Sequence, residues 1–221
     1  MSRSRLFFLC SLALTGLTVS ATPLTGRLEG ETYVSATGEF RIRAPVLPEL
    51  GGSIEDSENT VTFHDDFSTH LSIACFELDA PQRWEFETRG LRDYLLYFLT
   101  DVVMVNFNAR FPGSKVESAR YLPELLDGSL IAYSLLPGGS NFEPQDMVPG
   151  ATPREHVTAK RGTLLFIRHR HVFVVSTELA ERATQRSTYR QTTEQENEQL
   201  TSRLTAVVGR MTFTHDQPRA P

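Results

Sequence analysis

The sequence predicts a single α+β domain in which helices pack on a mostly antiparallel sheet. Short stretches of alternating apolar and polar residues recur before residue 80 and again between 115 and 177. A helical, strongly apolar stretch separates the two groups, and an amphipathic helix follows the second. No internal repeat or low-complexity linker divides the 221 residues, so we expect one domain over 31–214.

The first part of the domain is expected to be a meander of short antiparallel strands joined by tight turns. Phe40 and Ile42, and later Val61 and Phe63, alternate with polar neighbours, as in half-buried strands. The expected strands cover 32–35, 39–44, 53–57, 60–64 and 71–75. The last of these would place Cys75 inside, as a small buried hydrophobic residue.

Residues 90–107 predict a long helix that is apolar nearly all round and therefore buried on most sides. A membrane span is the competing interpretation. Asp93, Asp101 and Asn106 argue against it, because the uncharged stretch is well short of the ~20 residues that a span needs. The run 111–113, Phe-Pro-Gly, should end the helix.

The second half of the domain predicts further strands and a C-terminal helix. The expected strands cover 115–122, 129–136, 162–168, 172–177 and 211–213. Residues 129–136 are apolar on both faces, so this strand should lie inside the sheet. Residues 137–157 predict a long loop, and 178–190 a helix or loop. Thr193 and Glu196 form a capping-box pattern that should begin the last helix.

The first 21 residues have the layout of a secretory signal peptide. Arg3 and Arg5 precede an apolar run over 6–19, and 19–21, Val-Ser-Ala, supplies small residues for cleavage. We therefore expect a periplasmic or secreted protein with no stable membrane span after cleavage. Residues 22–30 would be an exposed lead-in, and 215–221 a flexible tail.

Composition limits the function classes further. The formal net charge is -5, and loss of Arg3 and Arg5 would lower it by two. A mildly acidic surface argues against nucleic acid as a partner and against anionic membranes, since both need clustered Lys or Arg. Cys10 would leave with the leader, so Cys75 would remain alone without a disulfide partner.

The histidines are the first candidates for a metal site. His64 precedes an Asp-Asp pair at 65–66, and His169 and His171 are two residues apart. If the two turns met, imidazoles and carboxylates could bind zinc or copper. Because arginines at 168 and 170 interleave the second pair and would repel a cation, solvated turns are the favoured interpretation, and no cofactor is predicted.

Other chemistry-bearing residues give weaker patterns. Asp65 and Asp66 would point to opposite faces of an extended chain, so a turn is favoured over an acid–base pair. Neither Ser53 nor Ser140 lies in a Gly-x-Ser-x-Gly motif, and no phosphate-binding loop occurs. Trp84, the only tryptophan, is expected to anchor a loop to the core, with a partner contact as the alternative.

The order of elements resembles the PsbP-like fold over about 31–214. Tyr33, Gly38, Phe40 and Pro45 mark its opening strands, and short strands, a long helix, further strands and a late helix follow. The resemblance implies a binding or assembly module without catalysis, and it supplies no site residues.

The sequence therefore favours an exported, soluble, non-enzymatic binding or assembly protein of the bacterial cell envelope. Its partner would be another envelope protein or a small ligand. The alternative is a metal-dependent or hydrolytic enzyme with a site near the 138–157 loop and the hairpin turns.

Overall fold

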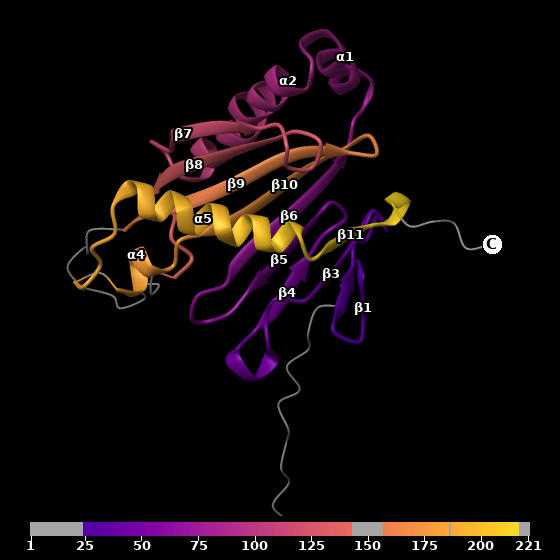
Figure 1. The fold of residues 1–221 in the computed structure, drawn as a ribbon. Coiled ribbons are helices and arrows are strands. Elements are labelled where there is room, and N and C mark those ends of the chain that lie inside the picture. The colour runs from indigo at the N-terminus through magenta and orange to yellow at the C-terminus, as the bar shows by residue number, and fades with distance from the viewer. Residues whose placement is uncertain (1–23, 143–156, 186, 217–221) are drawn as a thin grey trace, which may run out of the picture.

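The computed structural model describes residues 24–142, 157–185 and 187–216, which form two antiparallel sheets and several helices (Figure 1). The larger sheet has the strand order β4-β5-β6-β10-β9-β8-β7, and the smaller one β1-β2-β3-β11. The larger sheet contains β4 (Ser53–Asp56), β5 (Thr60–His64), β6 (His70–Glu77), β7 (Lys115–Leu122), β8 (Ser129–Pro137), β9 (Thr158–Arg168) and β10 (His171–Glu178). The smaller contains β1 (Arg27–Glu29), β2 (Thr32–Val34), β3 (Phe40–Arg43) and β11 (Met211–Phe213). The predicted α+β class is confirmed.

One face of the larger sheet is covered by the smaller sheet and by α5 (Thr193–Val208), which crosses in front of the strands in Figure 1. Gly162 in β9 permits this close packing, since a Cβ there would lie 3.0 Å from the Leu200 Cβ. The predicted capping box is wrong by one residue. Thr192 is the N-cap, and its side chain and that of Gln195 exchange hydrogen bonds with each other's backbone N–H.

The opposite face is covered by a helical run of α2 (Leu91–Phe98), a π-helical turn (Leu99–Val103) and α3 (Met104–Arg110). Leu95 and Leu99 are fully buried among residues of β8 and β9. Val105 is 58% exposed, so burial holds for the sheet-facing side of this helix rather than for most of its circumference. The run ends before Phe111, as predicted. None of the described helices is long and apolar enough to cross a membrane.

Residues 80–89 form helix α1 (Ala80–Arg89) where the sequence analysis expected a loop. Asp79 caps it by accepting a hydrogen bond from the Gln82 N–H, and a proline lies in its first turn. Both are ordinary helix-start signals. The prediction that Trp84 anchors this segment to the core is wrong, because its side chain projects from α1 and is 62% exposed.

The helices cover the larger sheet unevenly. In β8 the six residues 129–134 are all buried, which confirms the expected interior strand. In β5 and β6, by contrast, Phe63 and Ile73 are buried against the smaller sheet and α5, whereas Thr62 and Ser72 are only partly buried. The β4–β6 half of the α2–α3 face is therefore covered by none of the helices in the described part of the chain.

The ends of the domain are more ordered than the sequence suggests. Strand β1 falls within the expected lead-in at 22–30, and the backbone N–H groups of Thr25 and Gly26 donate to Asp56. After β11, Asp216 pairs with Arg168. The expected helix or loop at 178–190 contains the short α4 (Glu181–Thr184). The predicted signal peptide at 1–21 lies outside the described residues.

Candidate binding site

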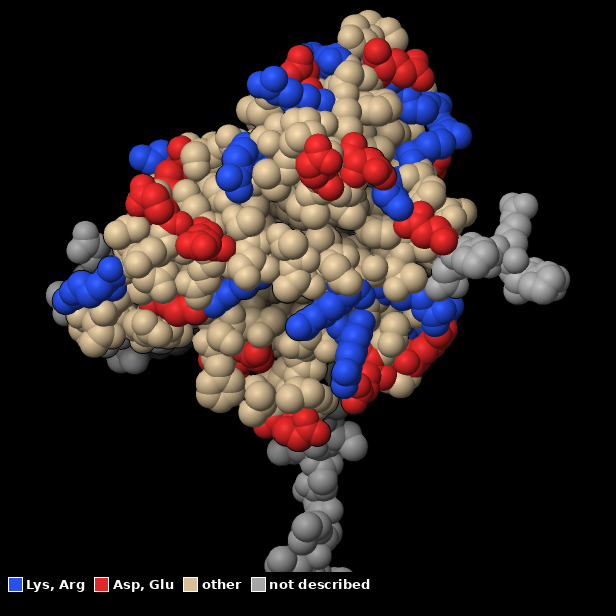
Figure 2. Space-filling view, viewed as in Figure 1, with Lys and Arg blue, Asp and Glu red and all other residues tan. Residues whose placement is uncertain are grey.

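A groove of about 800 Å³ lies on the half of the sheet that α2–α3 leave uncovered. Its floor is the outward face of β5, β6 and β10, and the π-helical turn and α3 form one wall. Charges of both signs are interspersed on the opposite, α5 face, and neither forms a continuous patch there (Figure 2). The groove lies on the other face of the larger sheet, away from α5.

A row of hydroxyl groups crosses the groove floor. Thr62, Ser72, Ser176 and Thr163 are successive cross-strand partners from β5 through β6 and β10 to β9. Thr163 and Ser176 hydrogen-bond to each other at 3.1 Å. Since strand residues alternate between faces, the alternation that buries Phe63 places the hydroxyls of Thr62, Ser72 and Ser176 in the groove, whereas Thr163 is fully buried at the end of the row.

Two arginines lie at the α3 end of the groove. The Arg161 guanidinium lies 5.8 and 5.7 Å from the ring centroids of Phe107 and Phe111, and it is largely buried. It donates to the Gly139 carbonyl oxygen at 2.8 Å and lies 3.6 Å from Glu178. Burial lowers the pKa of Arg161, and the Glu178 carboxylate opposes that effect. Arg110 lies beside it on α3, above the Phe111 ring.

A pair of histidines borders these arginines. His64 and His70 are directly opposite each other in the β5–β6 hairpin, and both line the groove. Burial, followed by the charges of Arg161, His64 and Arg110, lowers the pKa of His70 to about 4. His70 is therefore neutral near pH 7 and offers one donor and one acceptor to the groove.

His64 also makes a contact that the motif search missed. Its Nε2 lies 2.6 Å from the Ser53 hydroxyl, and the Glu55 carboxylate is 3.5 Å from the same nitrogen. Ser53 and His64 are cross-strand partners in the β4–β5 hairpin. The tight turn between 57 and 59 was the sequence signal for this pairing, because it fixes the register.

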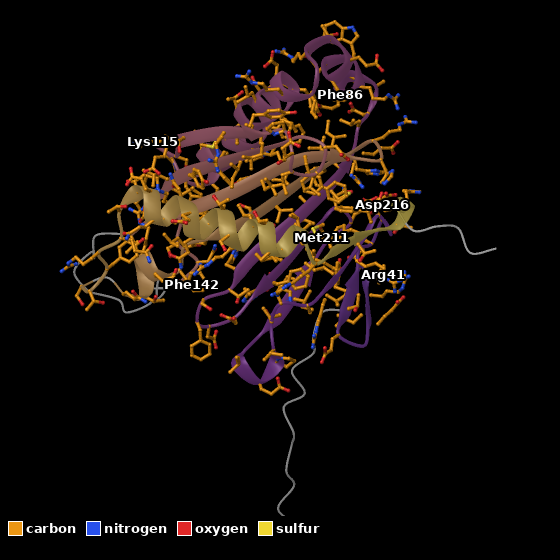
Figure 3. The ribbon with its side chains drawn as sticks, in the orientation of Figure 1. Arg41, Phe86, Lys115, Phe142, Met211 and Asp216 are labelled. Atoms are coloured by element: carbon orange, nitrogen blue, oxygen red, sulfur yellow. The ribbon has the colours of Figure 1, made fainter. Side chains whose placement is uncertain are left out.

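The structure does not bring the predicted metal candidates together. His64 pairs with the first residue of β6, whereas His171 pairs with Glu77, the last. Those seven steps of strand span roughly 23 Å. His169 lies at the far turn with Asp216, which Figure 3 labels well away from the groove residue Phe142. In the described part of the chain, no group of three or more His, Cys, Asp or Glu could hold a metal ion.

The acidic pair at 65–66 forms a turn, as the favoured interpretation held. Partial burial would raise the pKa of Asp65, but hydrogen bonds from the N–H groups of Thr69, Ser68 and Phe67 outweigh it and lower the pKa to about 2. The carboxylate is thus committed to holding the β5–β6 turn, and it is not part of an acid–base pair.

The first residues of the predicted 138–157 loop, which the structure describes up to Phe142, border the groove. Ser140 Oγ donates to the buried Glu178 at 2.6 Å, and the Asn141 side chain does so at 2.8 Å. Residues 143–156 lie outside the described part of the chain. Cys75 is 2% exposed in β6, and burial raises its pKa to about 12, which confirms that it is a buried hydrophobic residue.

A second buried charge cluster lies on the α5 face. Lys160 is fully buried, and its ammonium group pairs with Glu117 and, at 2.9 Å, with Glu196. Tyr189 donates to the other Glu196 oxygen at 2.6 Å. Every charge here has a partner, so the cluster ties α5 to β7 and β9 and is closed to a ligand.

No protein-family model matches the sequence, and no curated protein matches it. Among solved structures, the yeast Ran-binding protein Mog1p is similar over 86% of this chain and 96% of its own, with 11% identity and a TM-score of 0.46. Cyanobacterial PsbP from Synechocystis is similar over 82% and 91%, with 12% identity and a TM-score of 0.46. A Bacteroides thetaiotaomicron protein is similar over 88% of this chain, with 11% identity and a TM-score of 0.45. This chain spans about half, 52%, of that protein's length. A PsbP structure is therefore among the solved structures that this chain resembles, as the sequence predicted, and no activity is carried over with that likeness.

Proposed function

We propose that this chain is an exported, non-enzymatic binding protein of the bacterial cell envelope whose ligand occupies the groove beside α3. The observation that carries the proposal is the uncovered half of the sheet. A solvated sheet face ordinarily presents polar side chains to water, whereas this one also borders a cavity of about 800 Å³ lined by hydroxyls, imidazoles and guanidinium groups. That volume suits a small molecule or a short peptide.

Export is part of the proposal and rests on the sequence of 1–21. N-terminal sequencing of protein purified from the producing cells should begin at Thr22, and cell fractionation should find it outside the cytosol. Full-length protein retained in the cytosol would contradict this part and leave the groove untouched.

Filling the groove tests the binding function directly. Ala74 lies on the groove floor, so Ala74→Trp should displace a ligand that copurifies with the native protein, as read by native mass spectrometry. Thr212→Trp, at an exposed position of β11, is the matched control and should retain it. A ligand that stays bound in Ala74→Trp would place the site elsewhere.

The Ser53–His64 contact favours hydrolysis as a second candidate function. A serine hydroxyl 2.6 Å from an imidazole nitrogen has the geometry of a nucleophile and its base. Glu55 lies near the same nitrogen, so it does not orient the ring from the other side as a triad acid would. Ester hydrolysis that is abolished in Ser53→Ala and unchanged in Ser118→Ala, at an exposed position of β7, would favour the enzyme.

A further inference from the structure

The α3 end of the groove holds more positive than negative charge. Arg110 and Arg161 both line it, and the nearest carboxylate to Arg161 is that of Glu178, at 3.6 Å. Among the described residues, Arg110 makes no ion pair. One carboxylate therefore faces the largely buried Arg161, and the exposed Arg110 beside it has no carboxylate partner among the described residues.

The acidic groups nearby are already engaged or face away. Glu178 is 1% exposed and accepts hydrogen bonds from Ser140 and Asn141 in addition to facing Arg161. Asp65 accepts three backbone N–H groups in its turn. The Glu55 side chain is 77% exposed and lies beside His64. None of them is placed to neutralise Arg110.

Arg161 is also held in position before any ligand arrives. Arg161 is fixed by the two nearby rings and by its hydrogen bond to Gly139, and Arg110 lies 5.3 Å from the Phe111 ring centroid. A guanidinium that is already ordered loses little entropy when it binds an anion. Fixed, incompletely neutralised guanidinium groups that face a cavity are typical of sites for planar or tetrahedral oxyanions.

We infer that Arg110 and Arg161 bind the oxyanion group of a small ligand, a carboxylate or a phosphate, at the α3 end of the groove. The inference rests on the proposed function and names the chemical class of its ligand. The remainder of the ligand would lie along the floor, where the hydroxyls of Thr62 and Ser72 have no hydrogen-bond partner among the described residues.

His70 provides a direct reporter, because the charges of Arg161 and Arg110 contribute to its low pKa. An anion bound between them would offset those charges, so succinate or inorganic phosphate should raise the pKa of His70, measured by NMR titration. Choline chloride at equal ionic strength should leave it unchanged. The succinate and phosphate arms show which oxyanion the site prefers.

A charge-removing pair of variants makes the test specific. Arg110 is exposed and unpaired, so Arg110→Gln should fold normally and weaken succinate or phosphate binding by about tenfold or more. Arg120→Gln removes the same charge from an exposed position of β7 and should leave the affinity unchanged. An unmoved His70 pKa in both anions, or equal weakening in both variants, would overturn the inference.

The failures of the two proposals are distinguishable. A copurifying ligand that Ala74→Trp displaces but that carries no anionic group would overturn the oxyanion site and leave the binding function standing. A ligand that persists in Ala74→Trp would overturn the binding function of the groove itself.

Discussion

The two halves of one sheet face carry opposite kinds of side chain. Under α2–α3, β8 and β9 present Leu130, Ala132 and Leu165, which are buried at 1% exposure or less. Beyond the edge of the helix, β5 and β6 present Thr62 and Ser72 on the same face. The helix run, and not the sheet, decides which half is core and which half can meet a ligand.

The largest expected effect lies beneath the groove, on the other side of β5. Phe63 is fully buried against the smaller sheet and packs edge-on to the Tyr33 ring. Phe63→Ala should lower the free energy of unfolding by about 3–5 kcal/mol, because apolar contact is lost and a cavity remains. Urea denaturation measures it. A loss below about 1 kcal/mol would mean that this half of the sheet is not packed on that side.

The helix-covered half should respond almost as strongly. Leu99 is 1% exposed in the π-helical turn, so Leu99→Ala should cost about 2–5 kcal/mol of unfolding free energy. Asp101, on the exposed side of the same turn, is the control, and Asp101→Ala should change stability by about half a kcal/mol at most. Equal, negligible effects of both substitutions would contradict the packing of this run on β8.

Periodicity predicted most of the strands because alternation reports one-sided burial, and β5 and β6 follow it residue by residue. Prediction from the sequence pattern failed where one pattern allowed two interpretations. Trp84 could anchor a loop to the core or contact a partner, and the capped helix α1 carries it outward instead of into the core. Val105 belongs to the apolar run 90–107, but it is exposed because only one side of the helix packs on the sheet.

The site was less accessible to sequence reasoning. His64 was identified, but its partners come from register: Ser53 lies across one hairpin and His70 across the other. Arg161 comes from β9, about fifty residues after Arg110 and Phe111, and no local pattern joins them. The available signal was the pair Lys160-Arg161 at the start of an otherwise apolar strand, since charges there need a partner or a cavity.

The half of the sheet face that α2–α3 leave uncovered should also make the stability of the protein sensitive to acid. Burial and the nearby charges of Arg161, His64 and Arg110 lower the pKa of His70 from 6.5 to about 4, so the unfolded chain binds a proton more readily than the native protein between these values. Stability should therefore fall as the pH drops through this window, by about 1–2 kcal/mol from pH 7.5 to pH 5. Denaturation at both pH values should show this loss reduced in His70→Gln and retained in His169→Gln, at the distant turn.

The smallest expected effect on stability falls on the groove floor, and it separates site from core most sharply. Ser72 is partly exposed, and its hydroxyl has no partner among the described residues, so Ser72→Ala should change the free energy of unfolding by about half a kcal/mol at most. The same change should weaken ligand binding, because a bound polar group would lose a hydrogen-bond partner.

Ser134→Ala, at a fully buried position of β8 whose hydroxyl contacts the Met104 sulfur, is the matched comparison. It should leave the affinity unchanged. Urea denaturation and calorimetric titration of the two variants measure both properties. If Ser72→Ala proved the more destabilising and left binding intact, the uncovered half would be structural, and the division of the sheet face into core and site would be wrong.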